Sequence, residues 1–269
     1  MPRNSSLDSQ GRAHAARSRS RASRIGGVAL IGFAVAMNVP FALLATYFEY
    51  PAILREEPLV ILERFHAAGP SLLAVWYAYA FVAISFLPIA WSIDKQLGPH
   101  RSASPRLAPA VAVLAGAVQS LALLRWVFVV PGLAQRVSDP GVGEAERASI
   151  ATSFEVLHQF LGVAMGEHMG QALTALWTVL VAWELRRGKR GERMLAGAGV
   201  AAAALLWVGL TEGFATVLDF EPGVLALATP VGFVGWSVWL AALGVHFVRA
   251  ASFVADQPPA DGASFQSSA

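Results

Sequence analysis

Long runs of apolar residues alternate with short polar segments along this chain of 269 residues. Six such runs cover about 25–48, 71–93, 107–130, 158–185, 194–218 and 224–248. Each is long enough to cross a hydrocarbon core of roughly 30 Å as a tilted helix. The pattern predicts an all-α polytopic membrane protein with six transmembrane helices in one bundle. Residues 1–24 and 249–269 are polar, and we expect them to be disordered tails, the first of them basic.

Composition supports a membrane protein and excludes several other classes. Hydrophobic residues make up 55% of the chain and charged residues 14%, a balance that a soluble core of this size would not need. Cysteine is absent, which excludes disulfides, thiolate catalysis and cysteine-ligated metals. The isoelectric point near 9.3 comes mainly from arginines in loops and tail. We interpret these as topology signals rather than a nucleic-acid surface, so the expected partner is the lipid bilayer.

The distribution of basic residues predicts the orientation in the membrane. Six spans place both termini on one side, and fifteen of the twenty Lys and Arg residues lie in the segments on that side. The three opposite connectors hold four: Arg55, Arg64, Arg136 and Arg147. By the positive-inside rule, both termini are cytoplasmic.

Ionisable residues inside the spans form the main candidate site. Arg125 in the third span, Glu167 and His168 in the fourth, and Glu212 in the fifth all lie roughly 9 Å inward from the outer ends of their helices. Charges at such depths often mark substrate or ion sites. We therefore predict an outward-facing polar pocket in this layer. The alternative is an ion-pair network that only holds three helices together.

The fourth span has two distinct faces. Gly162, Gly166 and Gly170 recur every four residues and form a small-residue stripe on which another helix can pack closely. A second, polar face should look inward; its members are Glu167, Gln171, Thr174 and Thr178.

Metal binding and the common catalytic motifs receive little support. Glu155 and His158 have the i, i+3 spacing of helical-bundle metal sites, but no second Glu-x-x-His occurs, so they are weak candidates and we expect neither metal nor cofactor. Motifs of serine hydrolases, zinc proteases, P-loop proteins and dinucleotide-binding folds are absent as well.

Two connectors carry local signals. In residues 58–66, Leu59, Leu62 and Phe65 can share one helical face, which predicts either a helix lying on the membrane surface or a simple loop helix. Residues 138–141 have the sequence SDPG, which predicts a turn.

Four segments of the chain resemble a known family. They are FEYPAILREEP (48–58), WYAYAF (76–81), LRWVFVVPGLA (124–134) and HQFLGVAMGEHMGQALTALWT (158–178). Together they are similar to the bacterial multi-pass family catalogued as domain of unknown function 4386, over about residues 25–248. The resemblance implies a helical protein of the bacterial plasma membrane with about six spans. It implies no reaction, ligand or catalytic residue.

The leading functional hypothesis is non-enzymatic. We expect a binding, sensing or transport-related protein that accepts a small polar or lipid-headgroup ligand from the outer side, through Arg125, Glu167, His168, Glu212 and Gln171. One alternative is an intramembrane enzyme that uses Glu167 as acid or base while Arg125 orients an anionic group. The other is a purely structural role for these charges.

Overall fold

The computed structural model describes residues 4–97, 107–211, 218, 223 and 227–255. In this part of the chain the secondary structure consists of helices, with no strand. The helical runs are α1 (Asn4–Phe48), α2 (Pro58–Gln96), α3 (Leu107–Phe128) with the short α4 (Val130–Val137), the unbroken series α5 (Glu144–Leu157), η3 (His158–Gly170) and α6 (Gln171–Leu185), then α7 (Arg190–Gly209) and α9 (Ala228–Ala255).

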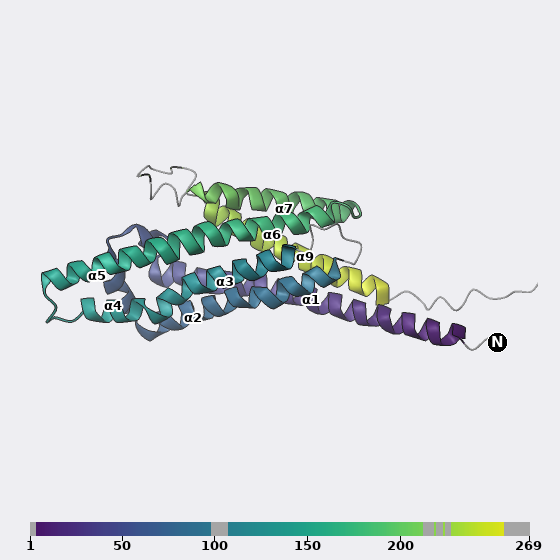
Figure 1. The fold of residues 1–269 in the computed structure, drawn as a ribbon, viewed down its shortest axis with the longest axis horizontal. Coiled ribbons are helices and arrows are strands. Elements are labelled where there is room, and N and C mark those ends of the chain that lie inside the picture. Colours follow the sequence, from purple (N-terminus) through teal and green to yellow (C-terminus); the bar gives the residue numbers. More distant parts are fainter. Residues whose placement is uncertain (1–3, 98–106, 212–217, 219–222, 224–226, 256–269) are drawn as a thin grey trace, which may run out of the picture.

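The long runs lie lengthwise beside one another (Figure 1), and their contacts form a ring in chain order. Each run packs on the next, with α3 contacting both η3 and α6, and the ring closes because α9 packs along α1. The start of α1 and the end of α9 lie at the same end of the bundle. The turn between α6 and α7 is also at that end, whereas the turn between α4 and α5 is at the other.

Five helices in the described part of the chain are long and apolar enough to cross a membrane. They are Ser20–Phe48, Pro58–Ile93, Leu107–Val137, Arg190–Gly209 and Ala228–Ser252. The α5–η3–α6 series also runs the length of the bundle (Figure 1), but its three parts have only 14, 13 and 15 residues. The molecule is an all-helical membrane protein, as its hydropathy predicts.

The outside of the bundle carries many exposed apolar side chains. Phe81 is 65% exposed, Phe128 73% and Val238 64%. A helix that is apolar all round is typical of a membrane span, where lipid covers the outer face. The interior face is marked instead by aromatic side chains, among which Trp76 and Trp126 stack with ring centroids 4.7 Å apart.

The first and last helices both extend into segments that we expected to be disordered. α1 begins at Asn4, although we expected a disordered tail up to residue 24. Alanine and arginine in this segment favour helix, and Ser20 and Ser23 donate hydrogen bonds to the carbonyl oxygens of Ala251 and Phe247 in α9. α9 itself extends to Ala255, beyond the expected boundary at residue 248. Residues 256–269 of the expected C-terminal tail lie outside the described residues.

The connectors at the opposite end are also largely helical. Residues from Pro58 form the first turns of α2, which bends at Gly69, where φ is +69°, a value that glycine adopts at little cost. Leu62 and Phe65 are buried in the protein core, so the apolar face of this segment packs on protein rather than on the membrane surface. The turn at 138–141 is confirmed: the Gly141 N–H donates to Oδ1 of Asp139 over 2.8 Å.

Candidate functional site

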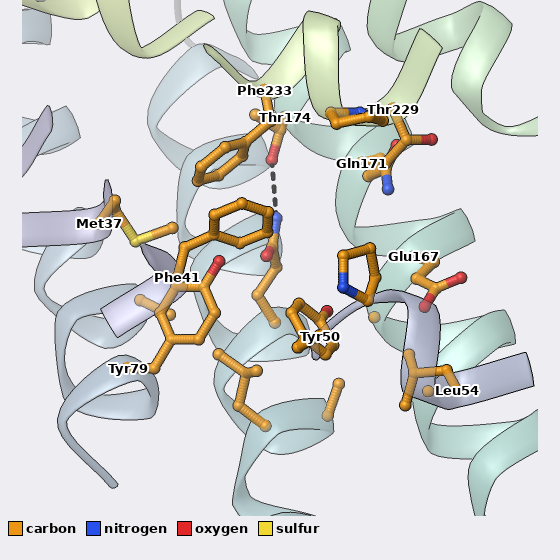
Figure 2. Close-up of a pocket in the computed structure, with 18 of the residues that line it drawn as sticks. Met37, Phe41, Tyr50, Leu54, Tyr79, Glu167, Gln171, Thr174, Thr229 and Phe233 are labelled. Carbon is orange, nitrogen blue, oxygen red and sulfur yellow. Dashed lines mark hydrogen bonds between the residues drawn. The ribbon is translucent and has the colours of Figure 1, made fainter. Parts of the chain in front are cut away.

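The ring of helices surrounds a partly open cavity of about 820 Å³. Its volume lies within the roughly 300–1,000 Å³ typical of small-molecule sites. Every long helical run contributes to the wall, and Figure 2 shows labelled side chains from several of them converging on the same space. The polar lining residues are Tyr50, Arg55, Tyr79, Gln119, Arg125, His158, Glu167, Gln171, Thr174 and Thr229.

Arg125 is the most deeply buried charged residue of the wall, with 6% of its surface exposed. Its Nη1 donates to the carbonyl oxygen of Ala122 over 2.7 Å, and its Nη2 lies 3.5 Å from Nδ1 of His158. The guanidinium carbon is 5.3 Å from the Trp126 ring centroid, and Nε has no hydrogen-bond partner. Among the described residues no carboxylate is within ion-pair distance, although the charge of Glu167 is near enough to act on Arg125. The guanidinium therefore keeps unused donor capacity beside the cavity.

The glycine stripe of the fourth run makes room for this arginine. A Cβ on Gly162 would lie 2.6 Å from Nη2 of Arg125, one on Gly166 2.9 Å from Cβ of Ala122, and one on Gly170 2.8 Å from Cγ of Gln119. Steps of four residues on η3 thus match steps of three on α3, which is the ridge-in-groove pattern of closely aligned helices. The stripe serves close packing and, at Gly162, also shapes the site.

The glycine stripe and Glu167 belong to a π-helical segment, η3, of 13 residues, whereas Gln171, Thr174 and Thr178 of the polar face lie in α6. π-Helical turns are rare and frequently occur at functional sites, because their wider turn re-aims side chains and alters backbone hydrogen bonding. Gly162, Val163, Gly166 and Glu167 of this segment all line the cavity. The unusual helix geometry therefore includes much of the wall that this run contributes, and α6 adds Gln171 and Thr174.

A belt of amide and hydroxyl groups lines the cavity from Arg125 toward the start of α3. Nε2 of Gln119 donates to Oγ1 of Thr174 over 3.2 Å, as the dashed line in Figure 2 marks. Oε1 of Gln171 is buried and has no hydrogen-bond partner. A buried acceptor without a donor is costly, so this oxygen can receive a hydrogen bond from a hydroxyl or N–H group placed in the cavity.

The floor of the cavity is aromatic. The rings of Phe33 and Phe86 stack at 5.2 Å, and Trp236 lies 5.8 Å from Phe86. The Trp236 indole N–H is satisfied because it donates to Oγ1 of Thr178 over 2.9 Å. This end of the cavity therefore offers apolar surface, whereas the end near Arg125 offers charge and hydrogen-bond donors.

The connector between α1 and α2 returns into the bundle and covers part of the cavity. Glu49 has φ of +54°, and the Tyr50 N–H donates back to the carbonyl oxygen of Leu44. Ile53, in the short helix η1 (Ala52–Arg55), is 1% exposed and anchors the segment. As a result, Tyr50 and Leu54 project toward the cavity near Glu167 (Figure 2).

The structure brings some of the predicted site residues together around the cavity and leaves others out. Arg125, Glu167 and Gln171 line the same cavity, while His168, on the same helix, is not among its lining residues. Glu212 lies outside the described residues. Of the weak metal candidates, Glu155 is exposed and His158 faces Arg125, and in the described part of the chain no three metal-ligating side chains cluster.

Sequence reasoning missed several members of the wall. His158 was predicted only as a weak metal candidate, and Tyr50, Tyr79 and Gln119 were not predicted as site residues. One signal was present: Gln119, Ala122 and Arg125 are spaced i, i+3, i+6, which places them on one helical face. The return of Tyr50 into the bundle has no comparable local signal.

Comparison with known proteins gives one match. The model of a family described as domain of unknown function (DUF4386) matches residues 25–244, in agreement with the resemblance noted from the sequence. Neither the search of curated proteins nor the search of solved structures finds a match.

Proposed function

Because the chain belongs to the family described as domain of unknown function 4386, whose description assigns no activity, we propose a function from the cavity itself. The protein is a six-span protein of the bacterial plasma membrane that binds a small polar or lipid-headgroup ligand from the outer side. Such binding suits a sensing or transport-related role.

The observation that carries this proposal is the environment of Arg125. A charge buried away from water normally has a counter-charge and a full set of hydrogen bonds. Arg125 has one carbonyl acceptor, a long contact with His158 and an unpartnered Nε. An anionic ligand group in the cavity would supply the missing acceptors, and a guanidinium is well suited to bind a carboxylate or phosphate with two hydrogen bonds.

The family resemblance supports the same site. Each of the four segments that carry it supplies cavity-lining residues: Tyr50 to Arg55 come from the first, Tyr79 from the second, Arg125 from the third and Glu167 from the fourth. These segments are far apart along the chain and have different helical neighbours. Their common feature is the cavity.

The proposed orientation rests on the arrangement of the ends. The start of α1, the end of α9 and the turn after α6 lie together (Figure 1), and this turn contains Arg186, Arg187, Lys189 and Arg190. Cytoplasmic loops carry the excess of basic residues. With that end inside, Arg125, near the far end of α3, belongs to the outer half of the bundle.

Cysteine labelling tests the orientation, because the natural chain has no cysteine. Gly141→Cys lies in the turn between α4 and α5, and Arg190→Cys lies at the start of α7; both positions are exposed. In intact cells, a membrane-impermeant maleimide should label Cys at 141 and should label Cys at 190 only after permeabilisation. The reverse pattern would place the cavity on the inner side.

Native mass spectrometry tests ligand binding. We expect the protein released from mild detergent to retain a small molecule, and Arg125→Gln to lose it. Arg136→Gln is the matched control, since Arg136 is an exposed arginine paired with Glu146 outside the cavity. A clean apo mass for the unmodified protein, with or without added membrane lipid extract, would contradict the proposal.

A further inference from the structure

The cavity combines two environments whose separation restricts the chemistry of its ligand. Among the described lining residues the charged side chains are Arg55, Arg125 and Glu167, two cations against one anion, so the lining carries a net charge of +1. The guanidinium of Arg125 lies beside His158 at one end. Aromatic rings of Phe33, Phe86 and Trp236 form the other end.

Two helices measure the separation. On α3, ten residues separate Trp126 from Gly116, and on α2, ten residues separate Trp76 from Phe86, or about 15 Å at 1.5 Å per residue. The two scales run alongside each other, because Trp76 stacks on Trp126 and a Cβ on Gly116 would lie 3.2 Å from the carbonyl oxygen of Ala83, seven residues from Trp76. The charged end and the aromatic floor are therefore about 10–15 Å apart along the bundle.

The volume suits one ligand of moderate size. At about 820 Å³ it lies within the range of small-molecule sites, and one hydrocarbon chain with a small headgroup is a ligand of that class. The polar belt at Gln119 and Gln171, about 9 Å from Arg125 by the six-residue spacing on α3, can also accept a hydroxyl group of the ligand.

We infer that the cavity binds a single-chain amphiphile whose anionic group, a carboxylate or a phosphate monoester, contacts Arg125 while its chain extends to the floor at Phe33, Phe86 and Trp236. This inference rests on the proposed ligand-binding function and specifies its ligand class. The anionic group supplies acceptors for the guanidinium, and the chain covers aromatic surface that would otherwise line an apolar void (Figure 2 shows the wall).

The test compares four probes on the delipidated full-length protein. The probes are oleic acid, oleoyl lysophosphatidic acid, uncharged monooleoylglycerol and two-chain dioleoyl phosphatidic acid, each competing against radiolabelled oleate. We expect one or both single-chain anions to bind at least about tenfold more tightly than monooleoylglycerol, because hydrogen bonds to charged groups are the stronger ones. The preference between oleate and lysophosphatidic acid then identifies the headgroup.

Variants locate the two ends of the ligand. Arg125→Gln should weaken binding of the anions at least about tenfold and leave monooleoylglycerol nearly unchanged, with Arg136→Gln as the unaffected control. Arg125→Lys keeps the charge and gives an intermediate loss, which serves if Arg125→Gln folds poorly. Ala115→Leu, on the wall near the floor, should shift the preference from oleate to the shorter laurate.

The outcomes separate this inference from the broader function. Equal affinity for monooleoylglycerol and the anions, or no effect of Arg125→Gln, would overturn the anionic headgroup while ligand binding stands. Equally tight binding of dioleoyl phosphatidic acid would overturn the single chain, and an unchanged chain-length preference in Ala115→Leu would overturn the placement of the chain. If none of the probes binds and native mass spectra also show no ligand, the proposed function fails with it.

Discussion

Glycines line the interface of α1 with α9 and that of α3 with η3, with different results. In the first, a Cβ on Gly27 would lie 2.5 Å from the Gly244 carbonyl oxygen, so backbone packs on backbone. In the second, the space beside Gly162 is occupied by the end of the Arg125 side chain. A small-residue stripe therefore does not by itself indicate simple packing, since the partner residue determines whether the space holds backbone or a functional group.

The largest stability effect is expected at the interface between α1 and α9. Gly27→Ala places a methyl group against backbone that cannot move aside, and should lower the free energy of unfolding by about 1–3 kcal/mol. Gly32→Ala is the matched control on the same helix, because nothing lies within 4 Å of that position, and it should be neutral or slightly stabilising. Unfolding in detergent measures both. Equal losses would mean that α1 and α9 do not pack as closely as described.

A smaller effect is expected at the floor of the cavity, where a polar contact joins α6 to α9. Thr178→Val removes the acceptor of the Trp236 indole N–H. It should lower the free energy of unfolding by about 0.6–1.7 kcal/mol, which are the average and the maximum measured for hydrogen bonds between membrane helices. Thr46→Val, at an exposed threonine that bonds only within its own helix, should cost less. Chemical denaturation of the two variants side by side gives the difference, and the opposite order would contradict the assignment.

At the cavity interface, stability and binding should respond differently. Gly162→Ala meets Nη2 of Arg125 and Nδ1 of His158, which are the ends of side chains that can rotate, so we expect a stability loss below about 1 kcal/mol. The displaced guanidinium should nevertheless weaken oleate binding several-fold. Gly132→Ala, with open space around it, is the control. A Gly162→Ala variant that loses stability as Gly27→Ala does, with unchanged binding, would make both interfaces purely structural.

The smallest expected effect is the coupling between the charges of the cavity. If Arg125 serves a ligand, a double-mutant cycle with Arg125→Ala and Glu167→Gln should give a coupling energy below about 0.5 kcal/mol in the ligand-free protein. A structural ion-pair network predicts a larger coupling, with the double variant rescued relative to the single ones. Thermal unfolding of the four proteins in detergent distinguishes the two interpretations.

Much of the fold could be predicted because it depends on local properties. Hydropathy and run length identified the apolar segments from α1 to α9, and the family resemblance agreed with them. Errors concentrated at segment ends. The helix starts at Asn4 and packs on α9, and the predicted helical segment after Pro58 joins α2 and packs on the core; polarity along the chain reports neither contact.

The site was predictable only in part, for a geometric reason. Arg125, Glu167 and Gln171 stood out because polar residues are rare in apolar spans, and all three line the cavity. The direction in which each residue points depends on the rotation of its helix. His168 could not be distinguished from Glu167 by depth, and the π-helical geometry of η3 changes the angle between successive side chains from the α-helical value assumed.

By itself, the sequence determined that this protein is helical, that it belongs in a membrane and which family it resembles, because these depend on composition and on short segments. Only the tertiary structure decided that Tyr50, Gln119, Arg125, His158 and Gln171 meet around one cavity. That meeting requires the ring to close between α1 and α9 and the 50–55 segment to fold back between the helices. Both depend on contacts between residues far apart in the chain, which no local pattern encodes.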